Sequence, residues 1–123
     1  MNLLLVMLGG ALGTGGRYLL GGWLNAQAAS GFPWGTLGVN LLGSLAIGAV
    51  FGLARQGAVP PGAILFLTVG VLGGFTTFST FSYETLRLLA DGSPGASFLN
   101  AAVQLAGGLA AVYAGFVAAR LLG

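Results

Sequence analysis

The chain alternates between long apolar segments and short polar connections. Four apolar segments run over about residues 3–24, 33–54, 62–90 and 97–122. A helix needs about 20 apolar residues to cross the hydrocarbon core of a bilayer, and each segment is long enough to do so. Because the connections are short, neighbouring helices have to run in opposite directions. The pattern therefore predicts an all-α membrane protein with four transmembrane helices in one integral membrane domain, residues 1–123.

Composition supports the membrane class and argues against an enzyme. Hydrophobic residues make up 56% of the chain and charged residues only 5%, whereas a soluble domain carries about 25% charged residues. Cysteine and histidine are both absent, which excludes disulfides and cysteine-based metal sites and removes the usual base for a serine or threonine nucleophile. Four arginines are too few for a nucleic-acid-binding surface. We expect a multi-pass protein of the plasma (inner) membrane.

The first segment could be mistaken for a secretory signal peptide. It has almost no positive charge before its apolar run, and that run is as long as a full membrane span. We therefore interpret it as the first transmembrane helix. Glycine is frequent, with 24 residues, and recurs at four-residue spacing, as in Gly9 and Gly13 or Gly48 and Gly52. Small residues at this spacing allow membrane helices to approach closely, so we interpret most of them as packing contacts.

Residues 70–84 of the third segment differ from the apolar helices around them. They include three glycines, five serine or threonine hydroxyls and three phenylalanines. Glycine loosens the backbone, and hydroxyl side chains compete for backbone hydrogen bonds, so the stretch predicts a break in the third helix. A broken helix is tolerated in lipid only where its free carbonyls are buried in protein or line a polar path. We therefore interpret this stretch as the functional centre.

Aromatic and hydroxyl side chains are interleaved just after the glycines. Phe78 and Phe81 are three residues apart and share one helix face, while Thr77, Ser79 and Thr80 lie between or beside them. A phenylalanine ring edge is the positive part of its quadrupole, so an edge-on ring can attract a small anion without a formal charge. Core packing is the alternative interpretation for both rings.

Other polar side chains lie within the predicted spans. Asn40 and Gln104 can each hold two helices together through hydrogen bonds, or can offer an amide donor to an anion. Arg17 and Glu84 belong to helices that run the same way, so both should approach the same membrane face. Charges within spans are usually paired or functional; these two residues either form an ion pair or rim a vestibule.

The arginines give no clear orientation. Arg55 and Arg120 should lie on one side of the membrane, and Arg17 and Arg87 on the other. Without a positive-inside bias the chain can insert both ways, and two oppositely inserted copies can pair as an antiparallel, dual-topology homodimer. The alternative is that so few arginines carry no information on orientation.

Motifs in three of the four segments carry a resemblance to a known family. They are the glycine-rich residues 9–18, the Asn40-containing residues 35–44, and residues 73–84, which contain the glycine, hydroxyl and phenylalanine cluster. Together they resemble the Fluc/CrcB family of small fluoride channels, and the resemblance extends over essentially the whole chain.

The resemblance implies a dual-topology antiparallel homodimer with two pores that export cytoplasmic fluoride passively and selectively. It implies that the fluoride pathway is lined by Asn40, Phe78, Phe81, Thr77, Ser79 and Thr80. It further implies a structural sodium ion (Na+) at the dimer centre, held by backbone carbonyls at positions that match Gly73 and Thr76. One position departs from the family, because Gln104 stands where members often have serine.

Two other functions are compatible with four small spans. A dual-topology multidrug/proton antiporter has the same size, but it needs an intramembrane carboxylate, and Glu84 lies near the end of its segment. A non-transporting assembly protein would rely on its small-residue faces alone. That function leaves the cluster of hydroxyls and phenylalanines without an explanation.

Overall fold

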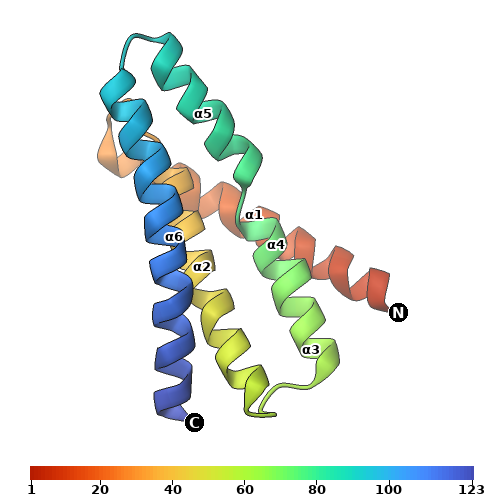
Figure 1. The fold of residues 1–123 in the computed structure, drawn as a ribbon. Helices are drawn as coiled ribbons and strands as arrows, with labels where there is room; N and C mark the ends of the chain where they lie inside the picture. Colours follow the sequence, from red (N-terminus) through yellow and green to blue (C-terminus); the bar gives the residue numbers. More distant parts are fainter.

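The computed structural model describes residues 1–123 and is entirely helical (Figure 1). Four helical units are long and apolar enough to cross a membrane, and the third of them is divided. The elements in chain order are α1 (Asn2–Ala28), α2 (Trp34–Arg55), α3 (Pro61–Leu65), the π-helix η1 (Phe66–Leu72), α4 (Gly73–Phe75), α5 (Phe78–Ala90) and α6 (Pro94–Leu122). The predictions of four membrane-length helices and of an interrupted third one are confirmed.

Helix ends differ from the predicted ones at two places. Helix α1 continues to Ala28 rather than ending near residue 24, because Asn25 stays helical and its side-chain oxygen accepts a hydrogen bond from Gly35 N at 2.7 Å. Helix α6 begins at Pro94, three residues before the predicted start. Proline suits the first turn of a helix, where its missing N–H has no partner to lose.

The helices pack as two pairs that meet near the break. Helix α2 lies along α6, and α1 crosses against η1 and α4 (Figure 1). Glycines allow both contacts: a Cβ on Gly48 would overlap the Val112 carbonyl of α6, and a Cβ on Gly9 would lie 2.7 Å from the Phe66 carbonyl of η1. The prediction that glycines at four-residue spacing mediate helix packing is confirmed at these positions.

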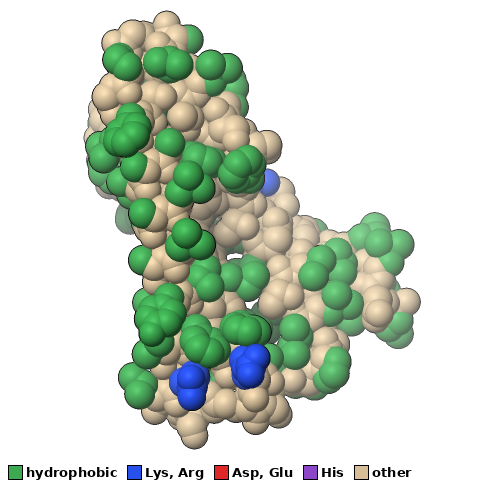
Figure 2. Space-filling view, viewed as in Figure 1, with side chains coloured by type: hydrophobic (Ala, Val, Ile, Leu, Met, Phe, Trp, Pro, Cys, Tyr) green, Lys and Arg blue, Asp and Glu red, His purple; other side chains and the backbone are tan.

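The outer surface is apolar. Only 19 of the 123 residues are buried, so most of the apolar side chains face outward, and hydrophobic side chains are spread over the whole visible face (Figure 2). Such a surface is unfavourable in water and suits the hydrocarbon of a bilayer. The chain is a multi-pass membrane protein.

Candidate functional site

The third membrane unit is interrupted by two extended residues between α4 and α5. Thr76 has φ −89° and ψ 159°, and Thr77 has φ −150° and ψ 124°. The Thr76 hydroxyl and N–H both donate to the Leu72 carbonyl, at 2.9 and 3.0 Å, which ends the first half. The Thr77 hydroxyl oxygen accepts from Thr80 N at 3.2 Å and so caps the start of α5. The hydroxyl side chains therefore define both sides of the break.

Glycine does not form the break. Gly73 has φ −62° and ψ −36° and is helical, so the glycine-rich part of residues 70–84 stays within the helix. Its neighbour Gly74 serves close packing instead, because an added Cβ there would lie 2.7 Å from the Gly10 carbonyl of α1. The backbone leaves the helical region only at the two threonines that follow.

Two carbonyls lose the helical donors that a continuous helix would give them. The N–H of Thr77, which would reach Gly73 O, donates to Asn40 Oδ1 instead. The N–H of Thr80, which would reach Thr76 O, donates to the Thr77 side chain. The carbonyls of Gly73 and Thr76 are thus freed by side chains that take their donors.

Asn40 of α2 bridges to the break from another helix. Its Oδ1 accepts from Thr77 N at 2.8 Å, and its Nδ2 donates to Thr77 O at 3.0 Å. The second Nδ2 hydrogen goes to Gln104 Oε1 of α6 at 2.8 Å. Both amide hydrogens of Asn40 are therefore used within the chain, and this side chain joins three helical units.

A row of buried polar side chains extends from Gln104 toward α5. Gln104 donates to Asn100 Oδ1 at 3.4 Å, and Asn100 donates to Thr85 Oγ1 at 2.9 Å. Asn100 is completely buried and Gln104 is 8% exposed. Sequence reasoning missed Asn100, although it lies four residues before Gln104 and so on the same face of α6. These bonds fix α6 against both α2 and α5.

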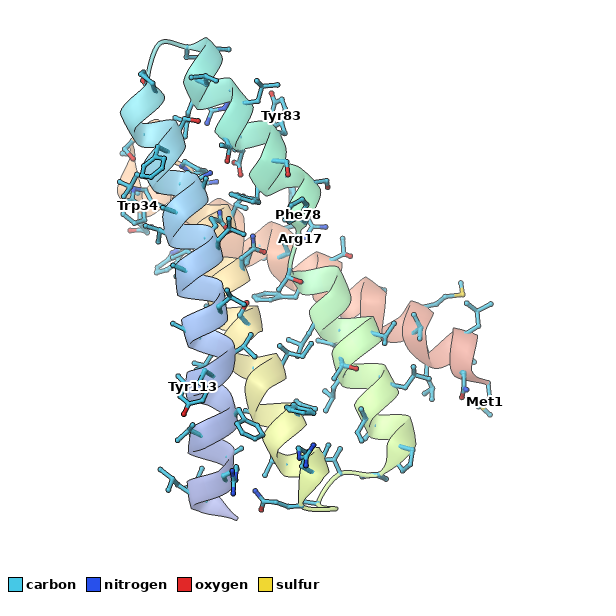
Figure 3. The ribbon with its side chains drawn as sticks, in the orientation of Figure 1. Met1, Arg17, Trp34, Phe78, Tyr83 and Tyr113 are labelled. Atoms are coloured by element: carbon cyan, nitrogen blue, oxygen red, sulfur yellow. The ribbon has the colours of Figure 1, made fainter.

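One cavity of about 270 Å³ lies beside the break. Asn40, Thr77, Phe78, Phe81 and Gln104 all line it. The two rings meet edge to face, with centroids 5.4 Å apart and planes at 69°. Their exposure differs sharply: Phe81 is 7% exposed and Phe78 is 73% exposed. Figure 3 shows Phe78 at the start of α5, next to the break.

A second cavity of about 180 Å³ includes Arg17, Thr77, Thr80 and Glu84 in its lining. Arg17 and Glu84 are brought together here but form no ion pair. Arg17 Nε donates to Gly74 O at 3.0 Å, just before the break. Glu84 Oε1 is buried without a hydrogen-bond partner.

The two cavities share one residue. Thr77 lines both, so the polar lining continues from Asn40 and Gln104 past the break to Thr80. Ser79, in contrast, lines neither cavity; its exposed hydroxyl lies 3.5 Å from the Thr77 hydroxyl. Fold and site together define a class: small multi-pass membrane proteins with a polar interior at a broken helix.

Comparison with known proteins assigns the chain within that class. The family model described as CrcB-like protein, Camphor Resistance (CrcB), matches residues 4–116. A protein of Thermus thermophilus named fluoride-specific ion channel FluC is 53% identical over 113 residues, which cover 92% of this chain and 89% of that protein. Proteins of the same name from Geobacter sulfurreducens and Anaeromyxobacter dehalogenans are both 46% identical over 122 residues, 98% of this chain and 98% and 97% of theirs. The chain belongs to the CrcB family.

Proposed function

We propose that this chain is a fluoride-selective channel of the plasma membrane, through which cytoplasmic fluoride leaves passively. The observation that carries the proposal is a pair of cavities, each with polar side chains in its lining, that share Thr77 across the break in the third membrane unit. The relatives named as fluoride channels supply the identity of the ion.

Fluoride is a strong hydrogen-bond acceptor, so a pathway has to replace its hydration shell with donors. The two cavities offer donors that are not fully used within the chain. Gln104 has one amide hydrogen without an acceptor, and the Thr80 hydroxyl accepts from Thr77 but donates to no protein atom. The edge of Phe78 or Phe81 adds a weak positive electrostatic surface without a fixed charge. Weak sites in sequence suit conduction, because each must release the ion as well as bind it.

A homodimer with antiparallel, dual-topology subunits completes the proposed channel. Phe78 is 73% exposed on the single chain although it lines the first cavity, so this cavity is open at the surface where a second copy would cover it. A balanced arginine distribution favours insertion both ways. Labelling of a terminal tag from each side of the membrane tests whether the chain inserts in both orientations. Termini found on one side only would contradict the dual topology.

The freed carbonyls suit a small hard cation. Sodium is bound by oxygen, and carbonyl rings replace an ion's hydration shell in channels. The Gly73 and Thr76 carbonyls, whose helical donors are taken by Asn40 and Thr77, would hold a structural sodium ion between the two subunits. The ion would supply positive charge that offsets the dipoles of these carbonyls, and would not itself be transported.

Fluoride efflux from liposomes that contain the purified protein tests the main proposal. A fluoride electrode should record rapid efflux, and vesicles without protein should retain their fluoride. Vesicles loaded with chloride in place of fluoride should retain it, as expected for a selective channel. Absence of fluoride efflux from correctly assembled protein would overturn the proposal. The alternative of a multidrug/proton antiporter finds no support among the relatives.

A further inference from the structure

Two arginines converge on one cavity, away from the break, at the ends of α2 and α6. Arg55 is in the last turn of α2 and Arg120 in the last turn of α6. Figure 2 shows two basic side chains next to each other at the end of the molecule that carries the C-terminus. The cavity has a volume of about 390 Å³ and is lined by Phe51, Gly52, Arg55, Gln56, Phe116 and Arg120.

Aromatic rings hold both guanidinium groups in place. Arg55 lies over the Phe51 ring at 5.8 Å, and Arg120 lies over the Phe116 ring at 5.7 Å. The two rings stack on each other, with centroids 5.3 Å apart and planes at 29°. A guanidinium group over a ring face keeps its N–H groups available at its edge. The stack therefore presents two oriented sets of donors to the same cavity.

The backbones of α2 and α6 approach closely next to this stack. A Cβ on Gly52 would lie 2.8 Å from both the Ala119 Cβ and the Phe116 carbonyl. Gln56 strengthens the contact, since its Nε2 donates to Ala119 O at 3.3 Å. The spacing of the two arginines is thus fixed by helix packing rather than by flexible side chains alone.

No acidic side chain balances these charges. The chain has two acids, Glu84 and Asp91; Glu84 lines the cavity beside the break, and Asp91 lies 3.8 Å from Arg87. A basic residue in the last turn of a helix is favourable on its own, because of the helix dipole. That explains either arginine alone, but not their convergence, which costs repulsive energy unless an anion joins them.

We propose that Arg55, Arg120 and Gln56 bind the phosphate of an anionic phospholipid headgroup. Arginine forks match the geometry of phosphate oxygens, and basic pockets between membrane helices are suited to anionic headgroups. The position favours a lipid over a free phosphate ion. The site lies at the ends of two membrane-spanning helices. Phe51, which lines the cavity, is 51% exposed on the apolar surface, where acyl chains lie.

Native mass spectrometry of the purified protein tests the proposal with phosphatidylglycerol and, as the neutral comparison, phosphatidylcholine with the same acyl chains. Arg55→Gln and Arg120→Gln should each lower the retention of phosphatidylglycerol about five-fold, the factor that corresponds to about 1 kcal/mol per arginine. Arg87→Gln is the matched control: it removes the same charge from an arginine outside the cavity, and retention should stay at the wild-type level.

Arg55→Lys adds a second test, because it keeps the charge and loses the planar fork. It should retain an intermediate amount of phosphatidylglycerol. Equal retention by the wild type, Arg55→Gln and Arg120→Gln would overturn the proposal, as would a loss in Arg87→Gln of the same size. Excess inorganic phosphate should not displace the lipid. Displacement by phosphate, with binding of phosphate alone, would assign the site to a soluble anion and overturn the lipid assignment.

Discussion

The side-chain amide of Asn40 pairs with both backbone polar groups of Thr77. Asn40 Oδ1 accepts from the Thr77 N–H at 2.8 Å, and Asn40 Nδ2 donates to the Thr77 carbonyl at 3.0 Å. An amide side chain has the same donor and acceptor pair as a peptide group, so it gives partners to the N–H and the carbonyl of an extended residue outside both helices. The break in the third membrane unit is therefore stabilised from α2.

Replacing Asn40 with leucine should destabilise the fold by about 1–3 kcal/mol, because two polar groups of Thr77 lose their partner. The loss should show as a lower thermal unfolding temperature in detergent and as reduced fluoride efflux. Ser79→Ala is the control, since the Ser79 hydroxyl is exposed and its one hydroxyl neighbour is at 3.5 Å. An unfolding temperature for Asn40→Leu equal to that of the control would show that the bridge contributes no stability.

The sequence predicted a break within residues 70–84 of the third helix, but not that it falls at Thr76 and Thr77. Glycines and hydroxyls together indicated a weak helix, and that is a local property. The position depends on Asn40, which lies 37 residues before Thr77, and no local pattern reveals such a contact. Gly73 and Gly74 remain helical, and only Gly74 is needed for close packing, because a Cβ there would lie 2.7 Å from Gly10 O. Likewise, the pairing of Arg17 with the Gly74 carbonyl depends on how α1 crosses α4.

Asn100 should act as a positioning residue for Gln104. Asn100 accepts a hydrogen bond from the Gln104 amide and donates one to Thr85, so Asn100→Leu removes both hydrogen bonds. We expect a coupling free energy of about 0.5–2 kcal/mol between Asn100→Leu and Gln104→Leu in a double-mutant cycle. The cycle is measured by unfolding of the purified variants.

Fluoride efflux gives the readout that separates positioning from general stabilisation. Asn100→Asp keeps an acceptor for Gln104 and should restore more efflux than Asn100→Leu at a matched unfolding temperature. Additive free energies in the cycle, together with equal efflux from Asn100→Asp and Asn100→Leu, would show that Asn100 contributes only to packing.

Phe78 and Phe81 should both be needed for fluoride flux but should contribute differently to the stability of the fold. Phe81 is 7% exposed and Phe78 is 73% exposed on the single chain. Replacing either with isoleucine removes the ring edge, so fluoride efflux should fall strongly in both variants. Volume is roughly conserved, so the loss of stability should stay below about 1.5 kcal/mol and should be larger for Phe81. If both isoleucine variants conduct like the wild type, the rings serve packing alone.

The sodium proposal depends on backbone carbonyls, and this makes its mutational pattern unusual. Thr76→Ser keeps the carbonyl and the hydroxyl that bonds Leu72 O, so we expect a mild effect. Gly73→Ala also keeps the carbonyl, and its new Cβ would meet only the Thr68 carbonyl, at an ordinary 3.5 Å. Gly74→Ala is the contrasting variant, because its Cβ would lie 2.7 Å from Gly10 O and push α1 away.

Removing sodium should therefore have a larger effect than either mild substitution. When a large organic cation replaces sodium on both sides of the membrane, fluoride efflux should fall and any dimer should dissociate more readily. The reason is that the Gly73 and Thr76 carbonyls, whose helical donors go to Asn40 and Thr77, would lose the cation that offsets their dipoles. Efflux from liposomes and the fraction of dimer on size-exclusion chromatography measure the two effects, with Thr76→Ser expected to respond to sodium as the wild type does. Identical efflux and dimer fraction with and without sodium would mean that the carbonyls are satisfied by something other than this ion.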